Sequence, residues 1–502
     1  MALGALLLLA GCGARTADKL VIIEVDGLRI ERQTRGASVG EVLAESNIQR
    51  GPLDRVIPDL NDPIDRVTRI SVIRVREETV DEQRVVPFAR TLLRDEAMAD
   101  GLSRVLQLGV NGHEDRTFKV VYENGVETIR DLLAAHMIEL PRDEIVLVGA
   151  KGLLHSVPLS GTVLYLSNGN AWLMRDASAT KRPLTFSGDL DGRVFVLAPE
   201  GNRLLYSRRS SVGGAVGAAG PLNSLWLIDT RFVGESPVQA GVDNVLYADW
   251  LNNYQFMFSS AERTIGAPGW KAHNDLVMFD LGTKASQLVI APLTHFAYAF
   301  WGATFTLSPD RKRMIYAGAD ELGFIDLPTG KRTVLQTFPV YQTMAGWVWT
   351  PDVAWSPDMR LLIATLHVPP LGTAQPENSP IFGVWAVNTA GAFAAQLAPD
   401  TGMFANPAWS KQGRIAYAQA HQPQHSADSE YDLWVMNVDG SGKQRVFPAQ
   451  GDHGLTNPQT AWSADGRQLI ALQDGNLFLV DTGAKSAAQL TADGGGTLVR
   501  WR

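Results

Sequence analysis

One short motif recurs along the C-terminal part of the chain and constrains its fold more than any other feature. Its clearest copies occupy residues 307–316, 354–364, 408–417 and 461–470, and looser copies occupy 197–206 and 250–258. Each copy predicts a β-hairpin, with an apolar strand, a turn of the Ser-Pro-Asp or Asp-Gly type, and a second apolar strand. Proline presets φ in such a turn and glycine accepts a positive φ.

Further apolar runs follow each hairpin. Third strands are predicted at 225–229, 433–437 and 477–481, and a fourth strand is predicted at 488–491. Four short strands repeated about every fifty residues are typical of a β-propeller, whose sheets bury their faces against neighbouring blades. The sequence therefore predicts a mainly β fold with a propeller over residues 160–502.

The two ends of this region predict a further blade. The six hairpins account for six blades, and 496–502 reads as an innermost strand that stops before its turn. The missing strands are predicted at the other end, at 162–167, 170–174 and 182–185. Joining both ends in one sheet makes seven blades and leaves no open edge strand.

The repeated Trp-Ser-Pro-Asp-Gly hairpin resembles the blades of TolB-type and WD-like propellers. The resemblance covers 160–502 and implies a fold rather than an activity, since such propellers serve as hydrolases, lyases, binding scaffolds and assembly partners. One alternative that it leaves open is a TolB-like assembly subunit of an envelope complex.

The overall charge argues against a nucleic-acid partner. The 502 residues carry 45 Lys and Arg against 53 Asp and Glu, a formal net charge of -8, and no basic run is present. Nucleic-acid binding requires a basic face that neutralises phosphates. The chain also has one cysteine, Cys12, which excludes an internal disulfide.

Cys12 ends the run LLLLAGC at residues 6–12. The apolar stretch is too short to span a bilayer. It resembles a bacterial lipoprotein signal, which implies cleavage before Cys12 and a diacylglycerol on its thiol; the alternative is a signal peptide that happens to contain a cysteine. Residues 1–18 are therefore predicted to be a signal and tether, and the mature protein to be extracytoplasmic and anchored to the cell membrane by lipid.

Residues 19–75 predict a small ubiquitin-like domain. Residues 19–31 alternate in polarity around an Asp26-Gly27 turn, which predicts a hairpin. Ser38 with Glu41 three residues later predicts a helix start, and 70–75 predicts a strand. Hairpin, helix and closing strand within about sixty residues match the length of one small domain.

Residues 76–152 are polar, with strands predicted at 79–87, 116–122, 126–130 and 145–148. The glycines at 101, 109, 112, 125 and 149 resemble those of the G-five domain. The preceding ubiquitin-like unit is similar to the one before that domain in resuscitation-promoting-factor-type cell-wall proteins. The resemblance implies an extracytoplasmic module that associates with cell-wall glycan, either peptidoglycan or another N-acetylglucosamine polymer.

No linear catalytic motif is present. The chain lacks Gly-x-Ser-x-Gly, His-Glu-x-x-His and a phosphate-binding glycine loop. Six histidines fall in propeller loops but spread over four predicted blades, so no metal site is predicted. We therefore expect no catalytic residue, no cofactor and no metal, with a propeller lyase or glycosidase as the alternative, because such enzymes place acids, His and Arg without a linear motif.

Loop lengths indicate the candidate binding surface. Long insertions fall between the second and third strands of the blades, and aromatic segments fall at 295–301 and 347–349, where the chain crosses between blades. Binding and catalytic residues are concentrated on the variable loops of a scaffold fold. The candidate ligand-binding residues are Trp270, His295, Tyr298, Trp301, Trp347 and Trp349, with Trp270 expected to be the most exposed. Packing between blades is the alternative role for Trp301, Trp347 and Trp349.

Overall fold

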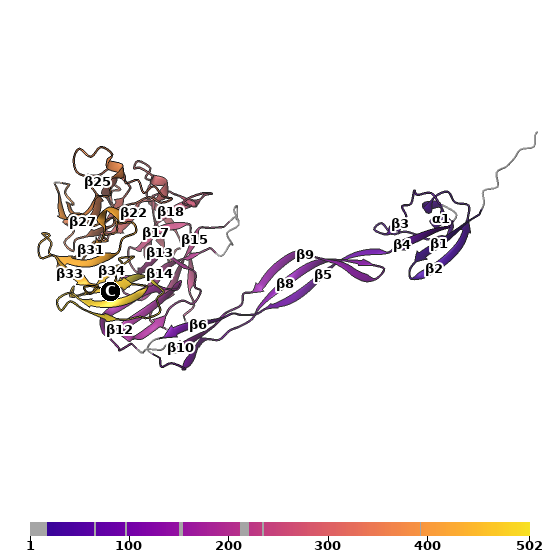
Figure 1. Ribbon diagram of the computed structural model, residues 1–502, viewed down its shortest axis with the longest axis horizontal. Coiled ribbons are helices and arrows are strands. Elements are labelled where there is room, and N and C mark those ends of the chain that lie inside the picture. Colours follow the sequence, from indigo (N-terminus) through magenta and orange to yellow (C-terminus); the bar gives the residue numbers. More distant parts are fainter. Residues whose placement is uncertain are drawn as a thin grey trace, which may run out of the picture. The chain divides into compact units, whose positions relative to one another are not determined.

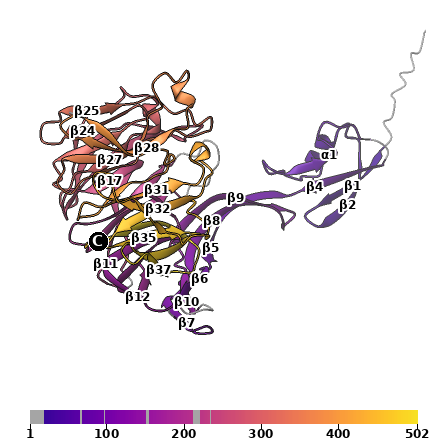
Figure 2. The same ribbon diagram turned by 60° about the vertical axis from the view of Figure 1, so that its left-hand side comes forward.

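The computed structural model describes residues 18–64, 67–95, 98–149, 154–210, 220–232, 235–391 and 393–502 (Figures 1 and 2). It divides into two compact units. Unit 1 holds the described residues up to Thr91 together with Gln107–Ile145, and unit 2 holds Leu92–Leu106 together with Val146–Arg502. The predicted lipidation site, Cys12, lies outside the described residues.

Unit 1 begins with a four-stranded sheet in the order β2-β1-β4-β3. Strand β1 pairs antiparallel with β2 and parallel with β4, and β3 pairs antiparallel with β4. A helix packs on this sheet through Val39, Val42 and Leu43, which share one buried cluster with the sheet residues. The elements are β1 (Lys19–Val25), β2 (Leu28–Thr34), α1 (Val39–Glu45), β3 (Arg55–Ile57) and β4 (Val67–Ile73).

The start of α1 follows the cap predicted from the sequence. The Ser38 side chain accepts a hydrogen bond from the Glu41 amide at 3.4 Å, and the Glu41 carboxylate accepts one from the Ala37 amide at 2.7 Å. The first bond satisfies an amide that a helix start leaves free, and the second fixes the residue before the N-cap. The predicted hairpin also forms, with β1 and β2 joined at Asp26-Gly27.

The rest of unit 1 is a long ribbon of β5 (Val75–Val86), β8 (Gly112–Glu123) and β9 (Val126–Glu139), paired in the order β5-β8-β9 (Figure 1). Every residue of β9 is exposed. Strand β9 is nine residues longer than predicted at its C-terminal end, because the ribbon is stabilised by pairing rather than by a core. A further short sheet, β6-β10-β7, has most of its residues in unit 2; its strands are β6 (Arg90–Asp95), β7 (Ser103–Gln107) and β10 (Glu144–Gly149).

Arg74 connects the two parts of unit 1. Its guanidinium donates to Asp26 and to Asp54, each at 2.7 Å, and its backbone exchanges two hydrogen bonds with Asn124 in the turn between β8 and β9. Charge-assisted pairs of this kind are the stronger hydrogen bonds of a protein. The Arg55–Glu123 ion pair and a hydrogen bond from the Val75 amide to Asp54 join the ribbon and the helix-bearing sheet as well.

Unit 2 repeats one antiparallel pattern. Within its described residues, seven antiparallel sheets follow one another between Pro158 and Trp501. Six of them, numbered here from Leu190 onwards, comprise β13 (Leu190–Leu197), β14 (Arg203–Arg209), β15 (Asn223–Asp229) and β16 (Val238–Asp243); β17 (Val245–Trp250), β18 (Gln255–Arg263), β19 (Trp270–Ala272), β20 (Leu276–Asp280) and β21 (Ser286–Ile290); β22 (Thr304–Leu307), β23 (Arg313–Ala317), β24 (Glu321–Asp326) and β25 (Arg332–Thr337); β26 (Val353–Trp355), β27 (Leu361–His367), β28 (Phe382–Asn388) and β29 (Ala394–Ala398); β30 (Ala408–Trp409), β31 (Ile415–Ala420), β32 (Tyr431–Met436) and β33 (Gln444–Phe447); and β34 (Thr460–Trp462), β35 (Gln468–Gln473), β36 (Asn476–Asp481) and β37 (Ser486–Gln489).

The seventh sheet joins the two ends of this region. Its strands are β11 (Pro158–Ser167), β12 (Asn170–Pro183) and β38 (Gly496–Trp501), in the order β12-β11-β38. Strand β38 pairs antiparallel with β11 from Val163↔Trp501 to Ser167↔Gly496. The chain is mainly β, as the motif predicts, and strands from both ends of residues 158–501 lie in one sheet.

The Ser-Pro-Asp turns form the predicted local hydrogen bonds. In the turn between β26 and β27, the Ser356 hydroxyl donates to the Asp358 carboxylate at 2.7 Å, and that carboxylate accepts the Arg360 amide at 3.1 Å. The Leu361 amide also donates to the Ser356 hydroxyl at 3.0 Å, and the same three bonds recur in the turns that begin at Ser308 and at Ser463. The carboxylates of the repeat therefore order their own turns.

The tryptophans of the repeat connect one sheet to the preceding one. The indole N–H of Trp250 donates to the Val196 carbonyl at 3.1 Å, that of Trp355 to Thr306 at 3.3 Å, and that of Trp462 to Ala408 at 3.1 Å. Each bond joins strands at matching edges of successive sheets. We call these edge strands the inner strands; they are β13, β17, β22, β26, β30, β34 and β38.

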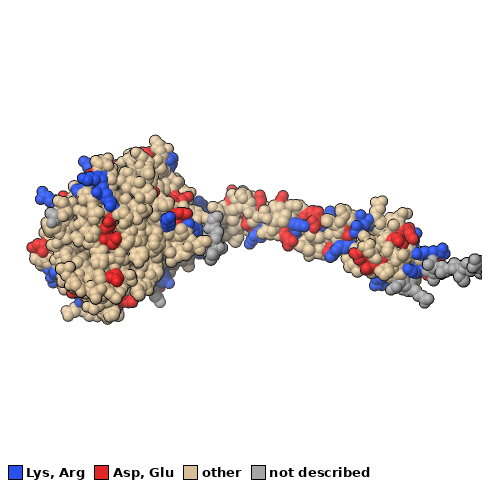
Figure 3. Space-filling model, turned by 90° about the horizontal axis from the view of Figure 1, so that it is seen from above, with Lys and Arg blue, Asp and Glu red and all other residues tan. Residues whose placement is uncertain are grey.

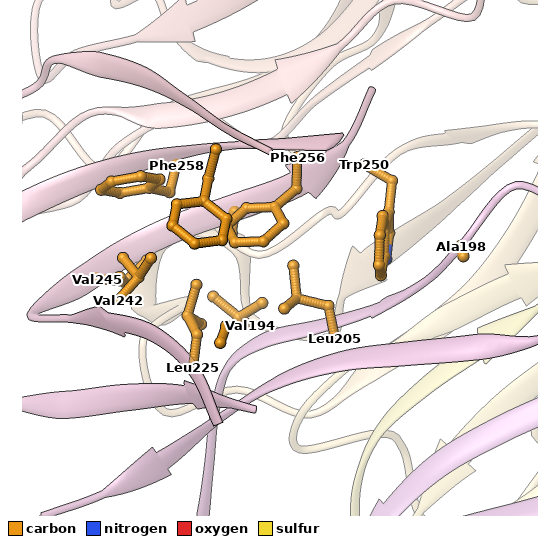
Figure 4. Close-up of a cluster of buried hydrophobic side chains, with 12 residues drawn as sticks. Val194, Ala198, Leu205, Leu225, Val242, Val245, Trp250, Phe256 and Phe258 are labelled. Atoms are coloured by element: carbon orange, nitrogen blue, oxygen red, sulfur yellow. The ribbon is translucent and has the colours of Figure 1, made fainter. Parts of the chain in front are cut away.

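Contacts link most successive inner strands. Strand β13 contacts β17, β17 contacts β22, β26 contacts β30, β30 contacts β34, and β34 contacts β38. The Trp355 bond joins β22 to β26, and the Arg502 guanidinium donates to the Leu197 carbonyl of β13 at 2.9 Å. Large apolar side chains fill the space between sheets, as between the first two, where Trp250, Phe256 and Phe258 pack above Leu205 and Leu225 (Figure 4).

Candidate functional site

A pocket of about 440 Å³ lies in unit 2 where three inner strands begin. Its walls come from the segment before β26, from Asn406 and Phe404 before β30, and from the segment before β34. The lining residues are Trp347, Val348, Trp349, Thr350, Asp352, Phe404, Asn406, Thr456, Asn457, Pro458 and Gln459. We call this the strand-start pocket. It contains two of the six predicted ligand-binding residues, Trp347 and Trp349.

The two tryptophans differ in role. Trp347 is half-buried, and its ring stacks on Phe404 with centroids 6.2 Å apart and planes 28° apart. Trp349 is 2% exposed, its indole N–H donates to the Met403 carbonyl at 3.0 Å, and its ring meets the Phe382 ring edge-on. Trp349 thus belongs to the core, which is the packing alternative of the sequence analysis, and Trp347 presents an aromatic surface to the pocket.

Asp352 supplies the only carboxyl group among the lining residues. Burial raises the pKa of Asp352 to about 7, and no charged or hydrogen-bonding neighbour contributes to the shift. Desolvation disfavours the charged form of an acid that lacks a partner. Near neutral pH this carboxyl group therefore occurs in both its protonated and its charged form. It can donate a hydrogen bond to a ligand or accept one from it.

Amide side chains complete the polar part of the pocket. Asn406 donates to the Pro458 carbonyl at 2.9 Å, which fixes its orientation, and Asn457 and Gln459 line the same space. One aromatic surface with a few convergent polar groups is typical of a small-ligand site. The combination suits a polar ring such as a sugar, whose apolar face can lie on Trp347 while its hydroxyls meet amides and a carboxyl group.

Trp270 and Trp301 form a separate pair. The Trp270 indole N–H donates to the Trp301 carbonyl at 3.0 Å, the rings meet edge-on at 6.4 Å, and the Arg193 guanidinium lies 4.2 Å from the Trp270 ring centroid. Both tryptophans are half-buried. The expectation that Trp270 is the most exposed candidate is wrong: Trp301 and Arg193 contact its ring, and Tyr298 is more exposed.

His295 and Tyr298 do not line the strand-start pocket either. The His295 imidazole lies 2.6 Å from the Glu321 carboxylate. Burial lowers the pKa of His295, and Glu321 opposes that shift. Tyr298 is 45% exposed and has a left-handed φ of 54° just before a 3₁₀ turn, η1 (Ala299–Trp301).

Asp352, Phe404 and Asn406 are site residues that the sequence analysis did not single out. Their common feature is position, since each directly precedes or lies within a few residues of an inner strand that begins a repeat. The starts of adjacent inner strands meet in space, so residues at these positions converge although they lie far apart in sequence. The repeat register was therefore a signal that could have identified them.

The described residues form neither a metal site nor a membrane-spanning helix. In the part of the chain that the structure describes, no three His, Cys, Asp or Glu side chains gather closely enough to hold a metal ion. None of the described helices has the length and apolar character needed to cross a membrane. Figure 3 shows acidic and basic side chains interspersed on the visible face, where no extended basic patch occurs.

The comparisons with known proteins identify one domain. Residues 77–151 match the G5 domain family, so the chain carries a G5 domain. The chain is 33% identical over 137 residues to Resuscitation-promoting factor RpfB from Mycolicibacterium smegmatis. That match covers 27% of this chain and 35% of RpfB, so the chain spans about a third of the length of this curated relative.

Solved structures resemble the chain more distantly. Hydrazine synthase from Kuenenia stuttgartiensis aligns with 58% of this chain and 77% of its own at 16% identity, with a TM-score of 0.41. A protein assigned as TolB from Agrobacterium tumefaciens aligns with 61% of this chain and 93% of its own at 15% identity, with a TM-score of 0.34. At these values the likenesses do not indicate an activity.

Proposed function

We propose that this is an extracytoplasmic, lipid-anchored protein that associates with cell-wall glycan through its N-terminal modules and binds a second ligand, a protein or a polymer, through unit 2. The observation that carries the proposal is the G5 match over residues 77–151, together with the similarity to RpfB. The glycan is peptidoglycan or another N-acetylglucosamine polymer. Residues 19–75 serve as a ubiquitin-like domain that precedes the G5 module.

Unit 2 acts as a seven-bladed propeller in this proposal, with the seven sheets as blades and β38 closing the ring against β11. The pairing of β38 with β11 and the indole bonds between inner strands support this arrangement. The strand-start pocket then opens at one mouth of the central channel. Its stacked Trp347 and Phe404 and its single carboxyl group favour binding of a sugar-containing polymer.

The lipid anchor rests on Cys12 and is tested by a single substitution. In cells that express the full chain, Cys12→Ser should move the protein from the membrane fraction to the soluble extracytoplasmic fraction, because no thiol remains to carry diacylglycerol. Fractionation followed by immunoblotting measures this shift. If the Cys12→Ser chain stays with the membrane to the same extent as the wild type, the anchor proposal is lost.

The ligand of the strand-start pocket is tested with soluble peptidoglycan fragments. Trp347→Ala should weaken fragment binding about tenfold, the equivalent of about 1.4 kcal/mol, because the aromatic surface is lost while the pocket's polar groups remain. Phe393→Ala is the matched control, since Phe393 is 55% exposed and does not line the pocket. Equal affinities for wild type and Trp347→Ala would contradict a role for this pocket in glycan binding.

A propeller enzyme of the lyase or glycosidase type is the second candidate, and the raised pKa of Asp352 favours it, since a catalytic acid needs a pKa near the working pH. Glycoside hydrolysis ordinarily uses two carboxyl groups across the scissile bond. The strand-start pocket contains one. Binding without hydrolysis therefore remains the function that the geometry supports better, and release of reducing ends from peptidoglycan fragments would reverse that preference.

A further inference from the structure

A second pocket, of about 320 Å³, lies where other inner strands end. Val196 and Leu197 end β13, Asp249 lies near the end of β17, and Arg500 and Trp501 end β38. The remaining lining residues are Thr162, Leu164, Arg311 and Arg502. We call this the strand-end pocket; none of its residues lines the strand-start pocket.

Positive charge dominates the strand-end pocket. Three guanidinium groups, those of Arg311, Arg500 and Arg502, face a single carboxylate, that of Asp249, which leaves an excess of two positive charges among the lining residues. Burial lowers the pKa of Arg502, and the nearby Arg311 lowers it further. Like charges are therefore held close together, an arrangement that costs free energy unless an anion compensates it.

The guanidinium groups keep donors free for a ligand. Arg500 donates to the Val499 carbonyl at 3.0 Å, Arg502 donates to the Leu197 and Ala198 carbonyls, and Arg311 donates to the Trp250 carbonyl. These bonds orient the side chains but use few of the five N–H donors that each group has. No ion pair within 4.0 Å joins any of the three to a carboxylate in the described chain.

The arginines of the strand-end pocket are accessible to a ligand. Arg500 and Arg502 are exposed, and Arg311 and Asp249 are half-buried. The strands around Arg500 lower its pKa by desolvation, while Asp249 opposes that shift. Burial raises the pKa of Asp249, although the three arginines oppose this. An anion can therefore reach the exposed guanidinium groups and accept charge-assisted hydrogen bonds from them.

We propose that the strand-end pocket binds a small oxyanion, carried by an organic phosphate or an organic carboxylate. Guanidinium groups match the oxygens of both classes in pairs. The ligand's apolar part lies against Leu164, Val196 and Trp501, which form the uncharged wall. This site uses different residues from glycan binding, so its existence does not depend on the proposed wall association.

The test is calorimetric titration of the full chain, as Cys12→Ser, with inorganic phosphate, pyrophosphate and citrate at low ionic strength. At least one of the three probes should bind, and 0.5 M NaCl should weaken it by screening. Pyrophosphate against citrate distinguishes the phosphate source from the carboxylate source. Arg500→Gln should lower the affinity about tenfold or more, since one guanidinium pair with an anion is lost.

Three further variants separate a binding role from a structural role. Arg502→Gln should also lower the affinity, and Asp249→Asn should raise it several-fold, because the one repelling carboxylate is removed. Lys312→Gln is the matched control; it removes the same charge next to Arg311, is exposed, and does not line the pocket. A site that only maintains the fold has no reason to bind anions better after Asp249→Asn.

The proposal is overturned if none of the three anions binds the wild-type chain, or if Arg502→Gln and Asp249→Asn leave the affinity unchanged. An equal loss in Lys312→Gln would also overturn it, because the effect would then report net charge alone. If Arg500→Gln does not fold, Arg502→Gln and Asp249→Asn still test the proposal. Both should fold, because Arg502 lies outside the last strand and Asn matches Asp in size.

Discussion

Trp250→Ala should lower the free energy of unfolding of unit 2 by about 3 to 5 kcal/mol, the usual cost of truncating a fully buried tryptophan. Trp250 has no exposed surface and belongs to the cluster between the first two sheets (Figure 4). Its ring meets Phe256 edge-on at 6.1 Å, and its indole N–H satisfies the Val196 carbonyl. The truncation therefore removes packing, leaves a cavity and removes the hydrogen bond to the part-buried Val196 carbonyl.

Chemical denaturation, followed by fluorescence and circular dichroism, measures this effect. Trp250→Phe separates the two contributions: it keeps most of the ring but loses the bond to Val196, so about 1 to 3 kcal/mol should be lost. Phe393→Ala is the exposed control and should change stability by no more than about 0.5 kcal/mol. If Trp250→Ala lowers the free energy of unfolding by less than about 1 kcal/mol, Trp250 does not stabilise the packing between the first two sheets.

Asp352→Asn should make unit 2 more stable than the wild type at alkaline pH and should remove part of its pH dependence. The pKa of Asp352 is raised by burial to about 7 in the folded chain, from an ordinary value of 3.8. Between these values the folded state holds a proton that the unfolded state has lost, so the wild-type free energy of unfolding falls as the pH rises. Below pH 4 both states are protonated and the effect vanishes.

Each pKa unit is equivalent to about 1.4 kcal/mol. The difference in free energy of unfolding between the variant and the wild type should therefore grow from about zero at pH 4 to about 4 kcal/mol at pH 8. Denaturation of both chains across this range measures it. Asp358→Asn is the control of opposite sign. The Ser356 hydroxyl and the Arg360 amide lower the pKa of Asp358, so that variant should cost stability by an amount that stays constant from pH 5 to pH 8.

A difference between Asp352→Asn and wild type that does not change with pH would mean that the Asp352 carboxyl group is hydrated or paired in solution. The strand-start pocket would then lack a protonated acid near neutral pH.

The repeated hairpins were predictable because their signal is local. Each copy carries its turn residues and its alternating apolar strands within about ten positions, and the turn bonds from Ser308, Ser356 and Ser463 form within that span. The start of α1 was predictable for the same reason, since the Ser38 side chain accepts the Glu41 amide and the Glu41 side chain accepts the Ala37 amide, all within five residues. Where three or four neighbouring residues determine the local structure, the sequence pattern was sufficient to predict that structure.

The site was harder to predict because its residues meet only through the repeat. Asp352, Asn406 and Gln459 precede strands of three different sheets and are unremarkable in their local sequence. Trp270 was misjudged because a loop rich in Pro and Gly predicts exposure, whereas the Trp301 carbonyl and Arg193 bind its ring from distant segments. The extra length of β9 was missed because every one of its residues is exposed, so no apolar pattern marks it.

Wall association is tested most directly by co-sedimentation of the full chain, as Cys12→Ser, with purified insoluble peptidoglycan. The substitution removes any lipid that could carry the protein into the pellet. The proposed function predicts that the protein sediments with peptidoglycan and that soluble N-acetylglucosamine oligomers release it. Protein that stays in the supernatant at every peptidoglycan concentration would contradict the proposal that the G5 domain at residues 77–151 binds cell-wall glycan.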